Sequence, residues 1–292
     1  MDLLYVQTPI LESLSLSKGL GIPVFLKMEA LQPTSSYKAR AAGLLISDHV
    51  TKGEQSFITA SSCADEALSL ANACRVLNCT LKLVVPSKIF SPLMKEKILE
   101  EGAEILEEGS DFQSAVKIAK SFADSQKIPF IDLLNNPLSK DGISTLIYEI
   151  FGAGLKPGAI LLYPSPDLLM GVCQGLKSCK WADVPIITAE SEVYCPFATA
   201  LLAGKRQAEG INHHVFETLE SQTIYPHIVE EEAVLDAWLQ FANEQLVLID
   251  KKQAAPLGLA HKKLPLLKTF SSLLIIVSGG ADVNLSTFKE FC

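Results

Sequence analysis

Short apolar runs alternate along this chain with longer segments of helical character. Strands are predicted at 23–28, 57–59, 81–85, 103–106, 129–133, 159–163, 184–188, 246–249 and 273–277. Helices are predicted at 35–52, 64–77, 92–101, 111–126, 142–151, 168–178 and 230–244. The strand segments are mostly continuous apolar runs, which is typical of strands buried on both faces. Alternating strands and helices of this kind predict an α/β fold built on a parallel sheet with helices on both faces.

Composition and charge narrow the function classes. The chain has 292 residues, of which 48% are hydrophobic and 20% charged, too apolar for a disordered protein. This length suggests about two domains or one large one. The 33 acidic residues outnumber the 25 basic ones and give a formal net charge of −8. Because nucleic-acid and anionic-membrane binders usually carry basic surfaces, we expect neither nucleic acid nor a membrane as partner.

The cysteines and the first residues bear on the cellular compartment in which the protein is expected. The seven cysteines are odd in number and include no C-x-x-C pair, which argues against a disulfide framework and a zinc site. The first residues are not basic, and Pro9 and Glu12 interrupt their apolar stretch, unlike a signal peptide. No apolar run approaches the ~20 residues that span a bilayer. We therefore expect a soluble, cytoplasmic protein with reduced thiols.

The segment 27–40 carries the first chemical signal. A turn at 32–34 precedes a predicted helix, for which Ser35 or Ser36 is a suitable N-cap, so that Lys38 falls in the first turn. The partial positive charge of a helix N-terminus disfavours an ammonium group and predicts a lowered pKa for this lysine. A lysine with a lowered pKa suits Schiff-base chemistry, although a solvated surface lysine is the commoner case.

The same segment resembles the lysine motif of the fold-type II pyridoxal-phosphate (PLP) enzymes, in particular the serine/threonine dehydratases. The family pattern is K-x-E-x-x-Q-P-[TS]-G-S-F-K-x-R-G. This sequence matches it at Lys27, Glu29, Gln32, Pro33, Thr34, Ser36, Lys38 and Arg40. The resemblance implies that Lys38 is the catalytic lysine that carries PLP. It also implies that Tyr37 packs on the cofactor ring.

The resemblance extends over most of the chain and implies an architecture. It implies two parallel or mostly parallel sheets flanked by helices, with a large cofactor domain at 1–37 and 139–292 and a small substrate-loop domain at 38–138. Segment 184–190 resembles a strand whose final Glu190 helps to hold a monovalent or divalent cation in some members. Segment 276–280 resembles the late strand in which Ser278 faces the pyridine nitrogen.

The expected phosphate loop departs from the family. A glycine-rich loop suits a phosphate because consecutive backbone N–H groups must converge on a dianion. At the corresponding place, before Leu168, this chain has Pro164, Ser165, Pro166 and Asp167. Two prolines remove two N–H donors, and hydrogen bonds to a charged group contribute ~1.5–3 kcal/mol each. We expect PLP binding weakened by roughly 3–6 kcal/mol, or about 10²–10⁴-fold. Asp167 is also a natural N-cap for the following helix.

The substrate loop departs as well. Family members carry S-x-G-N-x-G where this chain has residues 62–67. Ser62 is retained for substrate binding, and Cys63 lies beside it as a substrate-site candidate or a small buried residue. Asp65 replaces the asparagine that contacts the 3′ oxygen of the cofactor, and Glu66 adds another carboxylate. Both would repel a substrate carboxylate unless they belong to a solvated helix start.

Two further departures lie in the C-terminal half. Residues 250–254 read Asp-Lys-Lys-Gln-Ala where the family commonly has E-P-x-x-G near the wall of the active site. The stretch 204–229 is shorter than its counterpart in the dehydratases. Part of the wall around the substrate is therefore expected to be missing.

These observations leave several readings. The first is a serine/threonine dehydratase-like protein with weakened or lost PLP binding and catalysis, which binds a small amino-acid-like ligand. The second is an active PLP-dependent ammonia-lyase that converts L-serine or L-threonine to a 2-keto acid and ammonia. A third reading is altered chemistry without PLP. A fourth is a non-catalytic binding or regulatory partner of an active dehydratase. The chain would assemble as a homodimer or as a hetero-oligomer with a dehydratase.

Overall fold

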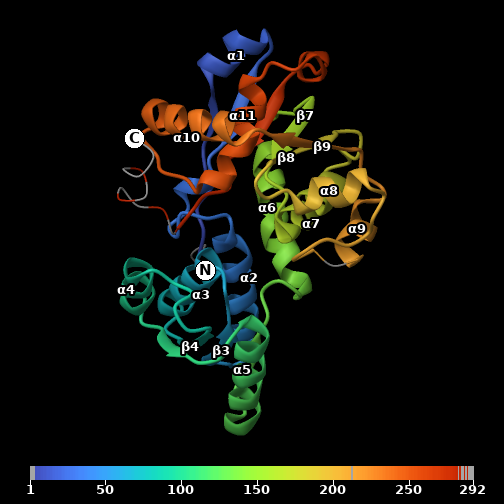
Figure 1. The fold of residues 1–292 in the computed structure, drawn as a ribbon. Coiled ribbons are helices and arrows are strands. Elements are labelled where there is room, and N and C mark those ends of the chain that lie inside the picture. The colour runs from blue at the N-terminus through green and yellow to red at the C-terminus, as the bar shows by residue number, and fades with distance from the viewer. Residues whose placement is uncertain (1–3, 212, 282, 284–285, 287, 289–292) are drawn as a thin grey trace. The chain divides into compact units, whose positions relative to one another are not determined.

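The computed structural model describes residues 4–211, 213–281, 283, 286 and 288. The chain divides into two compact units (Figure 1). The smaller unit comprises Met1–Val6 and Gln32–Gly142, and the larger unit comprises Gln7–Leu31 and Ile143–Cys292. Each unit has its own sheet.

The sheet of the larger unit has six strands. In chain order they are β1 (Ile10–Glu12), β2 (Val24–Lys27), β7 (Ala159–Leu162), β8 (Ile186–Ser191), β9 (Ile224–Val229) and β10 (Leu273–Ile276). They lie side by side in the order β1-β2-β10-β7-β8-β9. Only the pairing of β1 with β2 is antiparallel. The carboxyl ends of β10, β7 and β8 therefore meet at one edge, where parallel sheets commonly bind ligands.

Helices flank this sheet. They are α1 (Leu14–Leu20), the second half of α6 (Pro137–Gly152), α7 (Pro166–Ser178), α8 (Pro196–Leu202), α9 (His213–Leu219), α10 (Glu231–Gln245) and α11 (Ala255–His261), with short 3₁₀ turns η1 (Glu29–Leu31), η2 (Lys251–Ala254) and η3 (Pro265–Thr269). On one face, apolar residues of α1, α10 and α11 pack against Leu161, Ile187 and Ile275 of the central strands (Figure 1). Trp238 of α10 is buried there, and its indole N–H donates to the carbonyl of Ile249 at 2.6 Å.

The smaller unit has a four-stranded, wholly parallel sheet. Its strands are β3 (Ser56–Ala60), β4 (Thr80–Val85), β5 (Glu104–Glu107) and β6 (Phe130–Ile131), in the order β5-β4-β3-β6. Its helices are α2 (Lys38–Thr51), α3 (Ala64–Val76), α4 (Pro92–Glu100), α5 (Phe112–Gln126) and the first residues of α6. Three alanines of α5, at positions 115, 119 and 123, pack on Ile58 and Val84. Asp111 begins α5 with a capping box closed by Ser114.

The α/β fold with a parallel and a mostly parallel sheet is confirmed, whereas one predicted strand is wrong. Residues 246–249 form no strand. Leu246 has a left-handed backbone conformation that ends α10, and Ile249 is buried in irregular chain. A four-residue apolar run does not by itself distinguish a strand from a buried connection. The edge strands β1 and β9 were not predicted.

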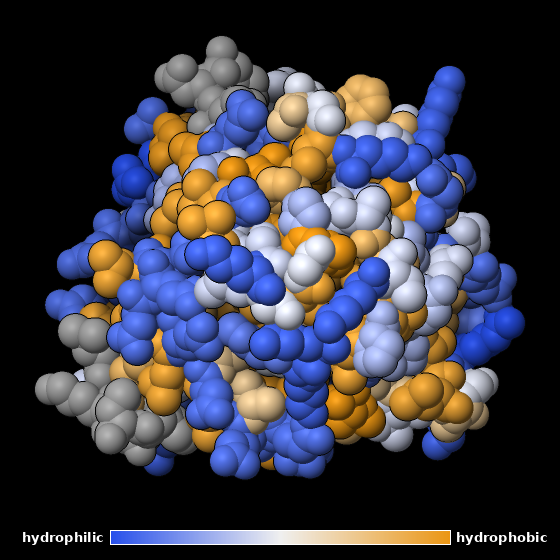
Figure 2. Space-filling view, turned by 90° about the horizontal axis from the view of Figure 1, so that it is seen from above, coloured by the Kyte–Doolittle hydropathy of each residue, from blue (hydrophilic) through white to orange (hydrophobic). Residues whose placement is uncertain are grey.

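The surface combines polar and apolar side chains. Some large apolar residues reach solvent, among them Leu14, Leu202 and Leu246. On the face seen in Figure 2, hydrophobic and hydrophilic residues are interspersed. Within the described residues, no helix is both long and apolar enough to cross a membrane.

Candidate functional site

Lys38 is the first residue of α2. The prediction that Ser35 or Ser36 caps this helix is wrong: the N-cap is Tyr37, which makes no side-chain cap bond. The hydroxyl of Ser36 instead accepts a long hydrogen bond from the Lys38 amide at 3.4 Å. Tyr37 is buried, and the Lys38 ammonium lies 5.5 Å from its ring centroid. The lysine therefore stands at a helix start, as the turn at 32–34 predicts, and beside an aromatic ring.

Two other motif residues, Lys27 and Glu29, hold the larger unit together. Both side chains are fully buried, with 3.9 Å between the ammonium and the carboxylate. The Lys27 ammonium also donates to the carbonyl of Thr8 at 2.7 Å and to Glu149 at 2.5 Å. The hydroxyl of Thr8 donates to Glu29 at 2.6 Å. Buried charges require such pairing, so these residues have a structural role.

Motif residues of the smaller unit have comparable roles. The side-chain amide of Gln32 exchanges two hydrogen bonds of 2.9 Å with the backbone of Val6. Arg40 is fully buried, and its guanidinium lies 4.9 Å from the ring centroid of Tyr5. These contacts fasten the N-terminal segment to the start of α2. They explain the presence of these residues without any catalytic role.

The candidate substrate loop lies between β3 and α3. Ser61 closes a tight turn, since its hydroxyl accepts from the Cys63 amide and donates to the Cys63 carbonyl, both at 3.1 Å. Ser62 is exposed, and Cys63 is the N-cap of α3. Asp65 and Glu66 lie in the first turn of this helix. There both half-buried carboxylates favourably oppose the partial positive charge of the helix N-terminus.

Cys63 has the electrostatics of an unreactive thiol. Burial raises its pKa above the ordinary value, and the carboxylates of Asp65 and Glu66 raise it further. The charge of Lys38 acts in the opposite direction but is outweighed. The thiolate is therefore disfavoured at neutral pH, although Lys38 lies close enough to influence this loop.

The turn from β7 to α7 tests whether a phosphate fits this chain. Proline at 164 and at 166 leaves those positions without an N–H, and the amide of Ser165 donates back to the carbonyl of Tyr163 at 2.9 Å. The amide of Leu168 donates to the Asp167 carboxylate at 3.0 Å. Four of the five amide positions from 164 to 168 are thus absent or engaged, so they do not form a cradle for a dianion.

The carboxylate of Asp167 makes the β7–α7 turn still less suitable for a phosphate. Its side chain is buried at the start of α7, where it places a negative charge at the helix N-terminus. Ser165, and not Asp167, is the N-cap, so the capping prediction for Asp167 is wrong. A carboxylate at this position occupies the region of positive potential at the helix N-terminus, which would otherwise stabilise a bound phosphate. The turn therefore does not fit PLP in the manner of a glycine-rich loop.

Glu190 ends β8 and has backbone partners. Its two carboxylate oxygens accept hydrogen bonds from the amides of Phe197 at 3.3 Å and Ala198 at 2.6 Å, at the start of α8. Burial raises its pKa, and these two hydrogen bonds partly offset the shift. No cluster of three metal-ligating side chains occurs within the described part of the chain. The observed role of Glu190 is to anchor the beginning of α8.

Ser278 follows β10 and is buried. Its hydroxyl donates a hydrogen bond to the side-chain oxygen of Gln253 in η2. Gln253 was not predicted as a site residue. The only indication in the sequence was that residues 250–254 differ from the E-P-x-x-G pattern of the family. The residue that resembles the pyridine-nitrogen partner is thus already engaged by a neighbouring side chain.

The predicted site residues therefore form two groups, one in each unit. Lys38, Tyr37, Ser62, Cys63 and Asp65 belong to the smaller unit, at the starts of α2 and α3. The 164–168 turn, Glu190 and Ser278 belong to the larger unit, at the shared carboxyl edge of its strands.

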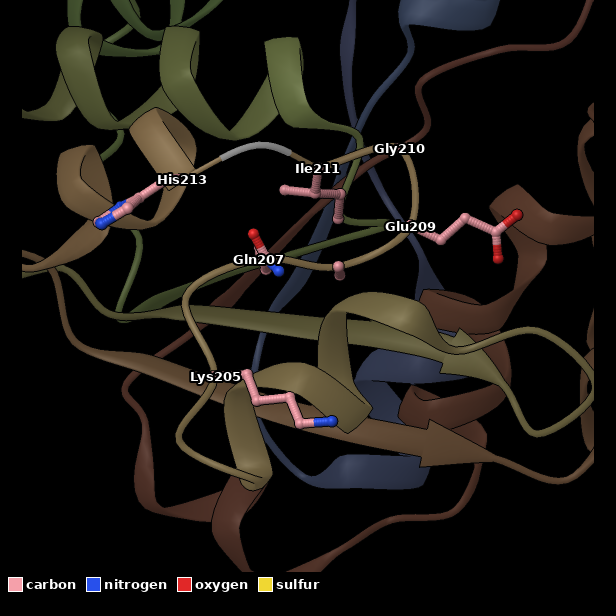
Figure 3. A pocket seen from close by; sticks show the side chains of 7 residues that line it. Lys205, Gln207, Glu209, Gly210, Ile211 and His213 are labelled. Atoms are coloured by element: carbon pink, nitrogen blue, oxygen red, sulfur yellow. The ribbon is translucent and has the colours of Figure 1, made fainter.

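A surface hollow of about 610 Å³ lies elsewhere on the larger unit. It is lined by residues 205, 207–211 and 213. Figure 3 shows that the side chains of Glu209 and His213 extend in opposite directions. Its charged groups do not converge on one point, so we do not assign a ligand to it.

Comparison with known proteins shows which family and which relatives the chain resembles. The sequence profile described as pyridoxal-phosphate dependent enzyme matches residues 1–279. The chain is 30% identical to an L-serine dehydratase of Dictyostelium discoideum over 98% of this chain and 91% of that protein. It is 29% identical to the L-serine dehydratase/L-threonine deaminase of Mus musculus, over 98% of this chain and 94% of that protein.

Solved structures agree on the fold. The fungal L-serine ammonia-lyase from Rhizomucor miehei superposes with a TM-score of 0.86 at 25% identity, covering 99% of this chain and 98% of that one. A maize serine racemase superposes with a TM-score of 0.86 at 21% identity over 98% and 91% of the two chains, a likeness of fold alone. By profile, sequence and fold together, this chain belongs to the pyridoxal-phosphate dependent enzyme family and is serine dehydratase/threonine deaminase-like.

Proposed function

We propose that this chain is a serine/threonine dehydratase-like protein in which PLP binding and catalysis are weakened or lost. The observation that carries the proposal is the β7–α7 turn. Its two prolines, its engaged amides and the buried Asp167 leave almost no donors for a phosphate dianion. On this proposal the large cofactor domain is 1–37 with 139–292, and the small domain is 38–138.

The smaller unit supports the proposal independently. Asp65 stands in the first turn of α3 where the family resemblance expects a neutral asparagine. A carboxylate accepts hydrogen bonds but cannot donate one, and it repels other anions. Compared with the family pattern, the substrate loop and the β7–α7 turn therefore both carry additional negative charge.

An active enzyme is the alternative, and the retained Lys38 at the start of α2 favours it. Such an enzyme would convert L-serine or L-threonine to a 2-keto acid and ammonia. In it, Lys38 would carry the cofactor, Ser62 and Cys63 would contact the substrate, and a cation at Glu190 would remain an option.

A steady-state assay separates the two. The purified protein is supplied with one equivalent of PLP and either L-serine or L-threonine, and formation of the keto acid is followed. Our proposal expects the rate of the wild-type chain to equal that of the Lys38→Ala variant. Keto-acid formation that depends on PLP and is abolished by Lys38→Ala would contradict it.

Without catalysis, the chain would act in the cytoplasm by binding an amino-acid-like ligand or by assembling with itself or an active dehydratase. The acidic net charge of −8 is compatible with such a role and disfavours nucleic acid. Co-expression with an active dehydratase, followed by size-exclusion chromatography, tests the assembly: a stable hetero-oligomer supports it, and separate elution contradicts it.

A further inference from the structure

A second hollow in the larger unit has a mostly apolar lining. Its volume is about 580 Å³, within the range of roughly 300–1,000 Å³ of small-molecule sites. It lies where α8, α9 and the beginning of β9 meet (Figure 1). We call it the apolar hollow, and its apolar lining consists of Leu201, Leu202, Phe216, Leu219, Ile224 and Pro226. A ligand with an apolar body would bury that body against side chains from all three elements.

The walls of the apolar hollow are fixed by contacts within the unit. Phe216 is buried, and its ring stacks on that of Phe197 in α8 with 5.6 Å between the ring centroids. The side-chain amide of Gln222 donates to the carbonyl of Val184 at 2.5 Å and holds the connection between α9 and β9. Because these walls are in place before any ligand arrives, the entropy cost of ordering them on binding is small.

The rim of the apolar hollow carries more positive than negative charge. Its charged lining residues are Lys205, Arg206 and Glu220. Arg206 forms an ion pair with Glu220, so these two charges largely cancel. The ammonium group of Lys205 has no hydrogen bond or ion pair with any other residue that the structure describes. A cation at the rim of an apolar hollow matches a ligand that joins an apolar chain to a carboxylate.

The end of α8 fixes the place of Lys205 on this rim. Gly204 has a left-handed backbone conformation with φ of +67°, and its amide donates to the carbonyl of Leu201 at 3.1 Å. The amide of Lys205 donates to the carbonyl of Ala200 at 2.9 Å. This pair of hydrogen bonds is a Schellman motif, which ends the helix at a defined point. The lysine side chain therefore leaves the chain beside the apolar lining.

The open edge of β9 disfavours a protein strand as the occupant. β9 is the last strand of the sheet, and the carbonyls of Thr223 and Val229 accept hydrogen bonds from the side of β8. Backbone groups alternate in direction along a strand, so those of Pro226, three positions from each, face the open edge. Proline has no N–H with which to pair an added strand. A small molecule therefore suits this place better than a partner chain.

We propose that the apolar hollow binds a small amphiphilic carboxylate, with its apolar chain against α8, α9 and β9 and its carboxylate at Lys205. The residues concerned belong neither to the β7–α7 turn nor to the start of α2. The inference therefore goes beyond the proposed function and does not depend on whether the chain binds PLP.

The test is a titration of octanoate into the full-length chain, followed by the methyl NMR signals of labelled leucine and isoleucine residues. We expect saturable binding with a Kd in about the millimolar range and shifts concentrated at Leu201, Leu219 and Ile224. Butanoate has four CH₂ groups fewer and should bind at least about tenfold more weakly. Octylammonium has the same chain with the opposite charge and should also bind at least about tenfold more weakly.

Two variants locate the site. Leu202→Glu adds a carboxylate to the rim and should weaken octanoate binding by about tenfold or more. Lys205→Met removes the cation and should weaken it by about two- to fivefold. The matched controls are Leu14→Glu in α1 and Lys268→Met in η3, which should leave the Kd unchanged. Leu202 is 66% exposed and Leu14 is 62% exposed, so both positions tolerate a charged side chain.

The outcomes are distinct. Absence of octanoate binding, equal binding of octylammonium, or a Kd that Leu202→Glu leaves unchanged overturns the inference. Equal weakening by Leu14→Glu would place the ligand elsewhere and also overturns it. If Leu202→Glu fails to fold, Lys205→Met decides against its control Lys268→Met. PLP binding is measured separately: tight PLP binding contradicts the proposed function alone, and failure of octanoate to bind contradicts this inference alone.

Discussion

The carboxylate of Asp167 accepts a hydrogen bond of 3.0 Å from the amide of Leu168, its immediate neighbour at the start of α7. An amide at the first turn of a helix is what an anion-binding turn offers to its ligand. Here the chain supplies the anion itself. This contact, with the prolines before it, is the physical basis for expecting weak PLP binding.

Restoring glycine across the turn should restore affinity. Replacing residues 164–167 by four glycines returns two N–H donors and removes one carboxylate, so PLP affinity should rise by about 10²–10⁴-fold. Fluorescence titration with PLP measures it. The control is Pro92→Gly, which removes an exposed proline from the start of α4. An affinity that does not change would show that the turn is not the obstacle.

The buried ammonium of Lys27 should be essential for stability. Lys27→Met leaves the carboxylates of Glu29 and Glu149 without their cation, which should cost about 3–5 kcal/mol of unfolding free energy in urea. Lys156→Met is the control, because the side chains of the Lys156–Asp183 pair are 46% and 68% exposed. A loss as small as that of the control would remove the structural role assigned to Lys27.

Close packing of α7 on α6 should make one glycine irreplaceable. A Cβ at Gly175 would lie 2.6 Å from Cβ of Ile147, so Gly175→Ala should destabilise the protein by about 1–3 kcal/mol. Nothing lies within 4 Å of a Cβ at Gly152, so Gly152→Ala is the matched control. Thermal unfolding measures both. Equal midpoints for the two variants would be inconsistent with the helix packing described.

The ion pair of Glu231 should give stability that depends on pH. Hydrogen bonds from Lys251 and Ser191 lower the Glu231 pKa below its ordinary 4.5. Because the folded-state pKa is lowered, the pair stabilises the protein above about pH 4.5, and this is lost as the pH falls through the folded value. Glu231→Gln should therefore cost on the order of 1 kcal/mol at neutral pH and almost nothing in acid.

Urea unfolding of Glu231→Gln at several pH values tests this. Glu232→Gln, at the exposed neighbouring position, is the control. A difference from wild type that grows as the pH falls would have the wrong sign.

The sequence was sufficient for the fold because strong apolar runs and one motif agreed. It failed where the signal was short or local. The run 246–249 looks like a strand, but Leu246 ends α10 in a left-handed conformation and Ile249 supplies a carbonyl to Trp238. The edge strand β9 contains Pro226 and partly exposed residues, which obscure strand periodicity.

The candidate site was predicted to a similar extent. The motif identified Lys38, and the missing glycines identified the β7–α7 turn. The bond between Ser278 and Gln253 was not predictable, because it joins two segments that meet only through the order of strands and turns. Likewise, the roles of Lys27 and Glu29 as a buried ion pair become evident only with Glu149 of α6 beside them.

The most direct test of weakened PLP binding is the equilibrium affinity of the purified wild-type chain for PLP. Protein is dialysed against PLP, and bound cofactor is read from its visible absorbance and from the thermal midpoint, which must rise if ligand binds only the folded state. Our account predicts a colourless protein whose midpoint does not rise with PLP. A yellow protein stabilised by PLP, with both effects abolished by Lys38→Ala, would contradict it.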